Sequence, residues 1–206
     1  CIRDSPDAAV RAADRLDSEG ALALSLRANR HIAQVDGGPA LRVVLVADLV
    51  GSTAINAELG NVAYHELVRE LIMLLRTALH ETGGVEFKHT GDGICAWYSS
   101  APAAVRGAER MHTVLAEHNA SHLGPALVVR TGLAAGEPVP DRGDLFGIEV
   151  ARASRLCDKA PDGGTLVSSE VIGMVETSEF QFSESGEHEL KGSPGKTAVY
   201  VVESMG

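Results

Sequence analysis

The segment Leu41–Thr53 places the strongest constraint on what this chain can fold into. It begins with a run of β-branched and aliphatic residues over 41–47, reaches a single carboxylate at Asp48, and then changes to small polar residues. A short, continuous apolar run bounded in this way is typical of a buried strand. We therefore predict a buried strand over 41–47 that delivers Asp48 to its carboxyl-terminal edge.

Composition limits the classes of function that are compatible with the chain. Hydrophobic residues make up 45% of the 206 residues but aromatic residues only 4%, so the core must be aliphatic. The net charge of -10 argues against a dedicated nucleic-acid binder, which needs a basic face. It does not argue against a nucleotide substrate, because bound metal ions supply local positive charge.

Cysteine usage and hydropathy point to a reducing, aqueous compartment. The three cysteines are scattered and form no CxxC pair, which indicates neither a zinc site nor a disulfide framework. No apolar run approaches the ~18 residues of a membrane-spanning helix. We expect a cytoplasmic location, either as a free protein or as the cytosolic part of a larger or membrane-anchored one.

A break at 36–39, Asp-Gly-Gly-Pro, predicts a domain boundary. Residues 1–38 are expected to form an N-terminal extension or linker helix, and 39–206 the main domain. The extension has two open interpretations: a packing or linker helix, or a transducing element below an upstream regulatory domain. The second gains interest because the chain begins with Cys1 rather than Met.

The remaining elements follow a β-α-β-β-α-β order. This order predicts an α+β fold with a ferredoxin-like split βαβ core, extended by a C-terminal helix and strands. The predicted elements are the strand 41–47, a helix over 61–82, strands at 85–88 and 94–98, a helix over 100–118, a strand at 127–133, a loop at 136–143, a helix over 147–160, and strands at 165–167 and 197–202.

Two acids define the candidate site. In a split βαβ, the end of the first strand lies beside the tip of the hairpin that follows the first helix, so Asp48 and Asp92 should meet at one sheet edge. Two unpaired carboxylates repel each other unless a cation lies between them, and Mg²⁺ or Mn²⁺ suits such oxygen ligands. The structural alternatives are a helix N-cap for Asp48 and a type I′ turn residue for Asp92.

Several blocks, in order, resemble one known family. From about 41 to 203 the chain is similar to a class III nucleotidyl cyclase domain, the adenylate and guanylate cyclase homology family. The matching blocks are 47–53, 87–93, 130–137, 143–147, 150–155 and 190–192.

The resemblance implies a two-metal reaction. Asp48 and Asp92, with the Leu49 backbone carbonyl, would hold two Mg²⁺ or Mn²⁺ ions. ATP would be converted to 3′,5′-cyclic AMP and pyrophosphate by attack of the ribose 3′-hydroxyl on the α-phosphate. Family members work as dimers, so a homodimer is expected with active sites at the interface.

The resemblance also assigns the substrate contacts. Lys88 and Asp144 match the pair that reads adenine, Arg155 the arginine that stabilises the transition state, and Lys191 a late lysine that contacts the triphosphate. Within the dimer, Asp48 and Asp92 would come from one subunit, and Lys88, Asp144 and Arg155 from the other. Without the resemblance, each of these four would be read as an ordinary surface, capping or loop residue.

One position departs from the family pattern. Ala151 stands four residues before Arg155, where the family usually has an asparagine that orients the ribose. Alanine cannot replace that hydrogen bond through its side chain, although Arg152 is a candidate substitute. Two hypotheses remain: an ATP-cyclising enzyme with a reduced rate, or a weak or inactive cyclase homology domain that binds nucleotide or dimerises to regulate an attached module. An RNA-binding ferredoxin-like domain is disfavoured, because aromatic stacking residues and a basic surface are missing.

Overall fold

A computed structural model describes residues 40–176, 178–189 and 196–203. The predictions for the 1–38 extension and for Lys191 lie outside these residues. The elements are β1 (Arg42–Leu49), α2 (Ser52–Thr82), β2 (Val85–His89), β3 (Gly93–Tyr98), α3 (Ala101–Ser121), β4 (Val129–Gly136), β5 (Val139–Asp141), β6 (Asp144–Phe146), α4 (Ile148–Lys159), β7 (Thr165–Ser168), α5 (Ser169–Ile172), β8 (Gln181–Glu189) and β9 (Lys196–Glu203).

The main sheet has the strand order β2-β3-β1-β4-β7-β9-β8. β1 pairs antiparallel with both β3 and β4, and β2 pairs antiparallel with β3. This arrangement of the first four strands is that of a split βαβ core, so the predicted α+β fold is confirmed. β7 then adds parallel to β4, and the β8–β9 hairpin completes the far edge.

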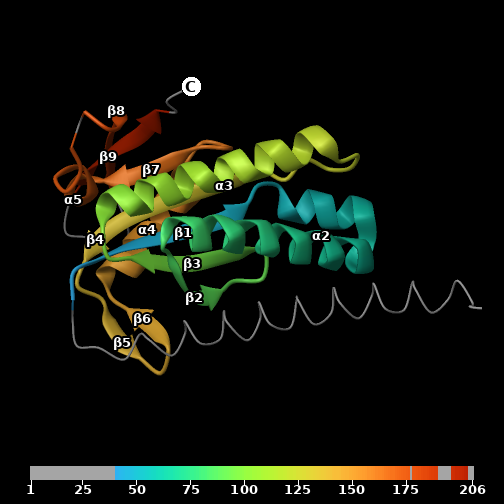
Figure 1. Cartoon of the computed structure of the whole chain (residues 1–206), viewed down its shortest axis with the longest axis horizontal. Helices are drawn as coiled ribbons and strands as arrows, with labels where there is room; N and C mark the ends of the chain where they lie inside the picture. The colour runs from blue at the N-terminus through green and yellow to red at the C-terminus, as the bar shows by residue number, and fades with distance from the viewer. Residues whose placement is uncertain (1–39, 177, 190–195, 204–206) are drawn as a thin grey trace, which may run out of the picture.

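The central strand β1 is buried on both faces. Val43, Leu45 and Ala47 contribute to the core beneath α2 and α3, whereas Val44 and Val46 contribute to the core beneath α4. Figure 1 shows α2 and α3 side by side over one face of the sheet. Because side chains alternate along a strand, Asp48 continues the row that faces α4.

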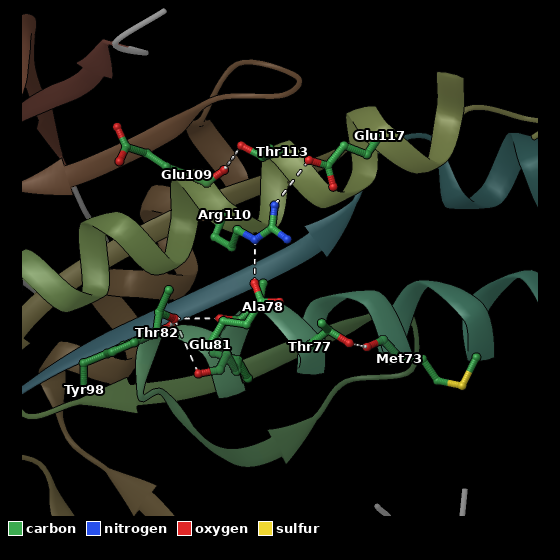
Figure 2. Close-up of polar contacts among 11 residues, drawn as sticks. Met73, Thr77, Ala78, Glu81, Thr82, Tyr98, Glu109, Arg110, Thr113 and Glu117 are labelled. Atoms are coloured by element: carbon green, nitrogen blue, oxygen red, sulfur yellow. Dashed lines mark hydrogen bonds and ion pairs between the residues drawn. The ribbon is translucent and has the colours of Figure 1, made fainter. Parts of the chain in front are cut away.

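Polar contacts tie α2 to α3 along their exposed side (Figure 2). Arg110 of α3 donates to Glu81 of α2 at 2.5 Å and to Glu117 at 3.5 Å. At the end of α2, the Thr82 and Tyr98 hydroxyls lie 3.0 Å apart. Exposed ion pairs of this kind contribute little individually, so the helix pair depends mainly on its shared aliphatic core.

Some predicted boundaries were wrong. The predicted helix over 61–82 is present, but it is preceded by a further helical segment that begins at Ser52 and is separated from it by a kink at Gly60, where φ is 74°. The predicted loop at 136–143 contains β5, which pairs with β6 in a separate two-stranded ribbon. α5 and β8 were not predicted, because α5 has a single turn and β8 alternates polar residues with few apolar ones. Within the described residues, no helix combines the length and apolar character needed to cross a bilayer.

α4 lies unusually close to the sheet at Gly132 of β4. A β-carbon there would collide with the backbone of α4 at Ala153 and Cys157. The absent side chain therefore lets the helix backbone pack directly on β4, and this contact fixes the height of α4 above the acid-bearing end of the sheet.

We predict that Gly132→Ala destabilises the domain by about 1–3 kcal/mol, because the collision involves backbone that cannot rotate away. The midpoint of urea unfolding measures this change. Gly173→Ala is a matched control, since its nearest neighbour lies 3.6 Å away and its φ of -63° suits alanine. The control should change stability by less than about 0.5 kcal/mol. Equal midpoints for the two variants would contradict the packing argument.

Candidate active site

The structure brings Asp48 and Asp92 together at one end of the sheet. Asp48 is paired with Gly93 in the β1–β3 register, and the Leu49 amide donates to the Asp92 carbonyl at 3.3 Å. Gly93 permits this approach, because a β-carbon there would collide with the Ala47 carbonyl and come within 3.0 Å of Asp48 Oδ1. The turn before β3 is thus pressed against the end of β1.

Neither acid has the purely structural role considered as its alternative, a helix N-cap for Asp48 and a type I′ turn residue for Asp92. The N-cap of α2 is Gly51, without a side-chain cap hydrogen bond, so Asp48 does not cap the helix. In the turn, the left-handed residue is Gly91, with φ 86°, and Asp92 does not have a positive φ. A type I′ turn needs positive φ at both central positions, so this turn does not require an aspartate at 92.

The environment of Asp48 disfavours its ionised form, despite the positive charge of Arg130 nearby. Burial raises the pKa of Asp48, the nearby Asp92 carboxylate raises it further, and the Arg130 guanidinium lowers it. The ionised pair is therefore disfavoured in the protein alone, and a divalent cation between the oxygens would relieve the repulsion. The donor set of two carboxylates suits Mg²⁺ or Mn²⁺.

Sequence reasoning missed two residues that contact this pair. The Tyr64 hydroxyl, on α2, donates to Asp92 Oδ2 at 3.3 Å. Arg130 of β4 lies opposite Asp48 in the β1–β4 register. Its Nη1 donates to the Asp158 carbonyl at 3.2 Å, while its Nε is buried and makes no hydrogen bond within the described residues. Arg130 begins one of the family blocks, which was the signal available in the sequence.

Lys88 and Asp144, the two residues expected to read the base, form a second cluster. Lys88 Nζ donates to Asp144 Oδ2 at 2.8 Å, and Asp144 Oδ1 accepts from the Leu145 amide at 2.8 Å. The register of β2 against β3 shifts between Glu86 and Lys88, and Phe87 at the shift lies in the core. Lys88 is therefore opposite Cys95, which belongs to the face of the sheet covered by α4. Asp144 is raised above the same face by the β5–β6 ribbon. The carboxylate hydrogen bond raises the pKa of Lys88.

Arg155 and Ala151 lie on the exposed surface of α4. Arg155 Nη1 donates to Asp158 Oδ2 at 3.2 Å, and its side chain is 47% exposed. Arg152 faces α5, where its Nη1 donates to Glu170 Oε1 at 2.6 Å. The guanidinium of Arg152 is thus engaged away from the Ala151–Arg155 row, which weighs against its replacing the missing asparagine.

Within the protomer, Asp48 and Asp92 form one pair and Lys88 and Asp144 another, while Arg155 contacts Asp158, the residue whose carbonyl accepts from Arg130. Among the interactions of residues 40–189, no hydrogen bond or ion pair joins either Asp48 or Asp92 to Lys88, Asp144 or Arg155. A nucleotide that used both groups within one protomer would have to bridge them, whereas a dimer can bring opposite groups together.

Comparison with known proteins identifies the family. The model of the adenylate and guanylate cyclase catalytic domain matches residues 42–204. A protein of Rhizobium meliloti named putative adenylate cyclase 3 is 31% identical over 157 residues, covering 73% of this chain and 26% of its own length.

Solved structures agree with this family assignment. An adenylate/guanylate cyclase/hydrolase from Silicibacter pomeroyi has a TM-score of 0.68 and 26% identity, covering 79% of this chain and 96% of that one. The adenylyl cyclase CyaB from P. aeruginosa has the same TM-score at 21% identity, with 80% and 94% coverage, and shows the shared fold.

The chain belongs to the adenylate and guanylate cyclase catalytic domain family. It is accordingly a nucleotidyl cyclase domain, the class of protein that binds a nucleoside triphosphate substrate. The chain spans about a quarter to a third of the length of the curated relatives it matches.

We predict that Asp48→Asn raises the melting temperature of the metal-free protein, because the neutral amide removes the repulsion from Asp92 and can donate to it. The same change should abolish the rise in melting temperature that Mn²⁺ produces by binding the native state. Differential scanning calorimetry with and without Mn²⁺ measures both effects. Asp162→Asn, at an exposed turn residue, is the control and should alter neither. A lower melting temperature for Asp48→Asn without metal would contradict the repulsion.

Proposed function

We propose that this domain converts ATP to 3′,5′-cyclic AMP and pyrophosphate as a homodimer. The observation that carries the proposal is the close approach of Asp48 and Asp92. Their carboxylates repel each other, and a divalent cation between them would stabilise the pair. A domain that only had to fold or dimerise would be more stable with one neutral side chain here.

The acids, the tyrosine and the arginine have complementary roles in this proposal. Asp48 and Asp92 would hold two Mg²⁺ or Mn²⁺ ions, with the Leu49 carbonyl as a further ligand. When bound, the metal supplies Lewis-acid activation of the ribose 3′-hydroxyl and charge neutralisation at the α-phosphate. Tyr64 orients the Asp92 carboxylate by its hydrogen bond. Arg130 lies opposite Asp48 in the sheet and adds positive charge beside the acidic pair.

Recognition of adenine is assigned to Lys88 and Asp144. The ammonium group can donate to a purine ring nitrogen, and the carboxylate can accept from the exocyclic amine. Guanine would require an acceptor in place of Lys88. The ion pair seen in the protomer holds the two side chains together before substrate arrives. Because Lys88 is 51% exposed, opening the pair costs little free energy.

The dimer is part of this proposal because the family resemblance divides the site residues between two subunits. One subunit would provide Asp48 and Asp92, and its partner would provide Lys88, Asp144 and Arg155. Arg155 is suited to this role, since it is exposed on α4 and its contact to Asp158 is itself exposed. Lys191 would add a contact to the triphosphate. An upstream regulatory domain belongs to the same proposal, since the curated relatives are much longer than this chain. A cytoplasmic location is also proposed, on the basis of the scattered cysteines.

We predict that the purified dimer forms cyclic AMP from ATP in the presence of Mn²⁺, and that Asp92→Ala reduces the rate by at least about 100-fold because a metal ligand is lost. The assay should compare ATP, GTP, CTP and UTP with each metal, following product by chromatography. ATP should give the highest kcat/KM.

Asp162→Ala serves as the control for removing one carboxylate, because Asp162 lies in an exposed turn. It should retain the full rate. Absence of cyclic nucleotide from dimeric protein at saturating Mn²⁺ would exclude the enzymatic function, whereas a preference for GTP would exclude only the assignment of Lys88 and Asp144.

The second candidate function is a regulatory module that binds nucleotide or dimerises without efficient catalysis. The exposed Ala151 favours it, because this position has no side-chain hydrogen bond to offer a ribose and Arg152 is bound to Glu170. Retention of both acids, the Lys88–Asp144 pair and Arg155 favours catalysis instead.

We predict that Ala151→Asn increases kcat, by as much as ~10²–10³ if the missing amide limits the rate. Residues 151 and 155 share one helix face, so the new amide would stand beside Arg155. Steady-state kinetics with ATP and Mn²⁺ measure the change. Ala151→Leu matches asparagine in size without its polar atoms and should not raise kcat. An unchanged rate in the asparagine variant would show that a different step limits turnover.

A further inference from the structure

A cluster of metal-ligating side chains lies outside the candidate active site, where α2 meets the end of α3. Glu70 of α2, His118 of α3 and His122, the residue that follows α3, each offer one ligand atom, and these atoms lie within 4.8 Å of one another. We propose that this cluster is a binding site for a divalent transition-metal ion, with Zn²⁺ as the best fit. The site uses none of the residues assigned to the nucleotide.

The donor types favour zinc over the hard cations that suit the active site. Two imidazoles and one carboxylate, with an open position for water, form a common three-ligand zinc set. Magnesium prefers oxygen ligands and would gain little from the histidines. The cluster thus differs chemically from Asp48 and Asp92, which offer oxygen alone.

The hydrogen bonds of His122 favour its use as a metal ligand. His122 Nδ1 lies 3.0 Å from the His118 carbonyl, which can only accept, so the proton lies on Nδ1 and the Nε2 lone pair is free. Metal-binding histidines usually donate their second nitrogen to a carbonyl in this way. Ser121 Oγ, also 3.0 Å from His122 Nδ1, lies beside the same proton.

The three side chains are already close to a coordinating arrangement. His118 Nδ1 lies 3.8 Å from Glu70 Oε1, and the two imidazole rings stack with centroids 3.9 Å apart. Two ligands on a tetrahedral zinc ion lie roughly 3.3 Å apart, given bonds of about 2.0–2.1 Å. Side-chain rotations can therefore close the set, since Glu70 and His122 are at the surface while His118 is only 9% exposed.

The three ligands lie in a pocket, and the segment that forms one side of it is held by hydrogen bonds. The three ligands line a pocket of about 130 Å³ between α2 and the segment that follows α3. Asn119 holds that segment through two hydrogen bonds of 2.9 Å, one to the Leu127 carbonyl and one from its amide. Three residues beyond Leu127, Arg130 faces Asp48 in the sheet. A bound ion would therefore cross-link α2 to a segment that leads directly into the end of β4 beside Asp48.

Zinc titration of the metal-free, full chain tests the proposal. In ¹H–¹⁵N spectra of the imidazoles, one equivalent of Zn²⁺ should shift the resonances of His118 and His122 and leave those of the exposed His65 and His80 unchanged. Calorimetric titration should show a loss of affinity of at least about tenfold in His122→Ala and His118→Ala. His80→Ala, on the same helix as Glu70, is the matched control and should bind as tightly as the unaltered chain.

Each outcome of these titrations either supports or overturns the proposed zinc site. His122 is exposed at the end of α3, so His122→Ala should remain folded even if His118→Ala does not, and far-ultraviolet circular dichroism checks this. Zinc affinity that His122→Ala leaves unchanged, or shifts confined to other histidines, would overturn the proposal. Binding that is lost only in Asp92→Ala would assign the zinc to the acidic pair instead. Cyclase activity enters none of these readouts, so their result is independent of the proposed reaction.

Discussion

The repulsion between two carboxylates at the end of β1 is the interaction on which the site depends. β1 is the central strand of the split βαβ core and is buried on both faces, so its end is held firmly. β3 and β4 flank it and bring the Asp92 turn and Arg130 to Asp48. The fold therefore holds together two charges that would separate if they were free. A divalent cation bound between the two carboxylates would relieve this repulsion.

Two glycines allow neighbouring segments to pack closely at this end of the sheet. Gly93 lets the turn approach β1, and Gly132 lets α4 pack its backbone on β4. The first contact sets the separation of the acids, and the second sets the height of the helix that carries Arg155. Both depend on the absence of one carbon atom, so the chemistry of the site relies on packing as much as on its charged residues.

The face of the sheet that carries α4 also carries the polar groups assigned to the nucleotide. The opposite face is covered by α2 and α3 and is mainly aliphatic, with Tyr98 and Phe180 in its core and one buried polar contact where His112 of α3 meets Thr131 and Thr165. One layer of the molecule therefore provides stability while the other provides chemistry. The Glu70–His118–His122 cluster is an exception, because it places metal-ligating groups on the supporting helix layer, at the end of the sheet that Asp48 also occupies.

The sequence by itself determined the order of the core elements, the buried first strand and the identity of both acids, because aliphatic runs, glycine breaks and family blocks are local signals. It did not reveal the β5–β6 ribbon that raises Asp144 toward Lys88, the helical segment between Ser52 and the kink at Gly60, or the positions of Tyr64 and Arg130 beside the two acids. Those depend on strand register and helix packing, which join residues distant along the chain. Only the tertiary structure could show that Arg152 donates to Glu170, or that Glu70 lies beside two histidines at the end of another helix. Neither contact produces a periodic pattern in the sequence.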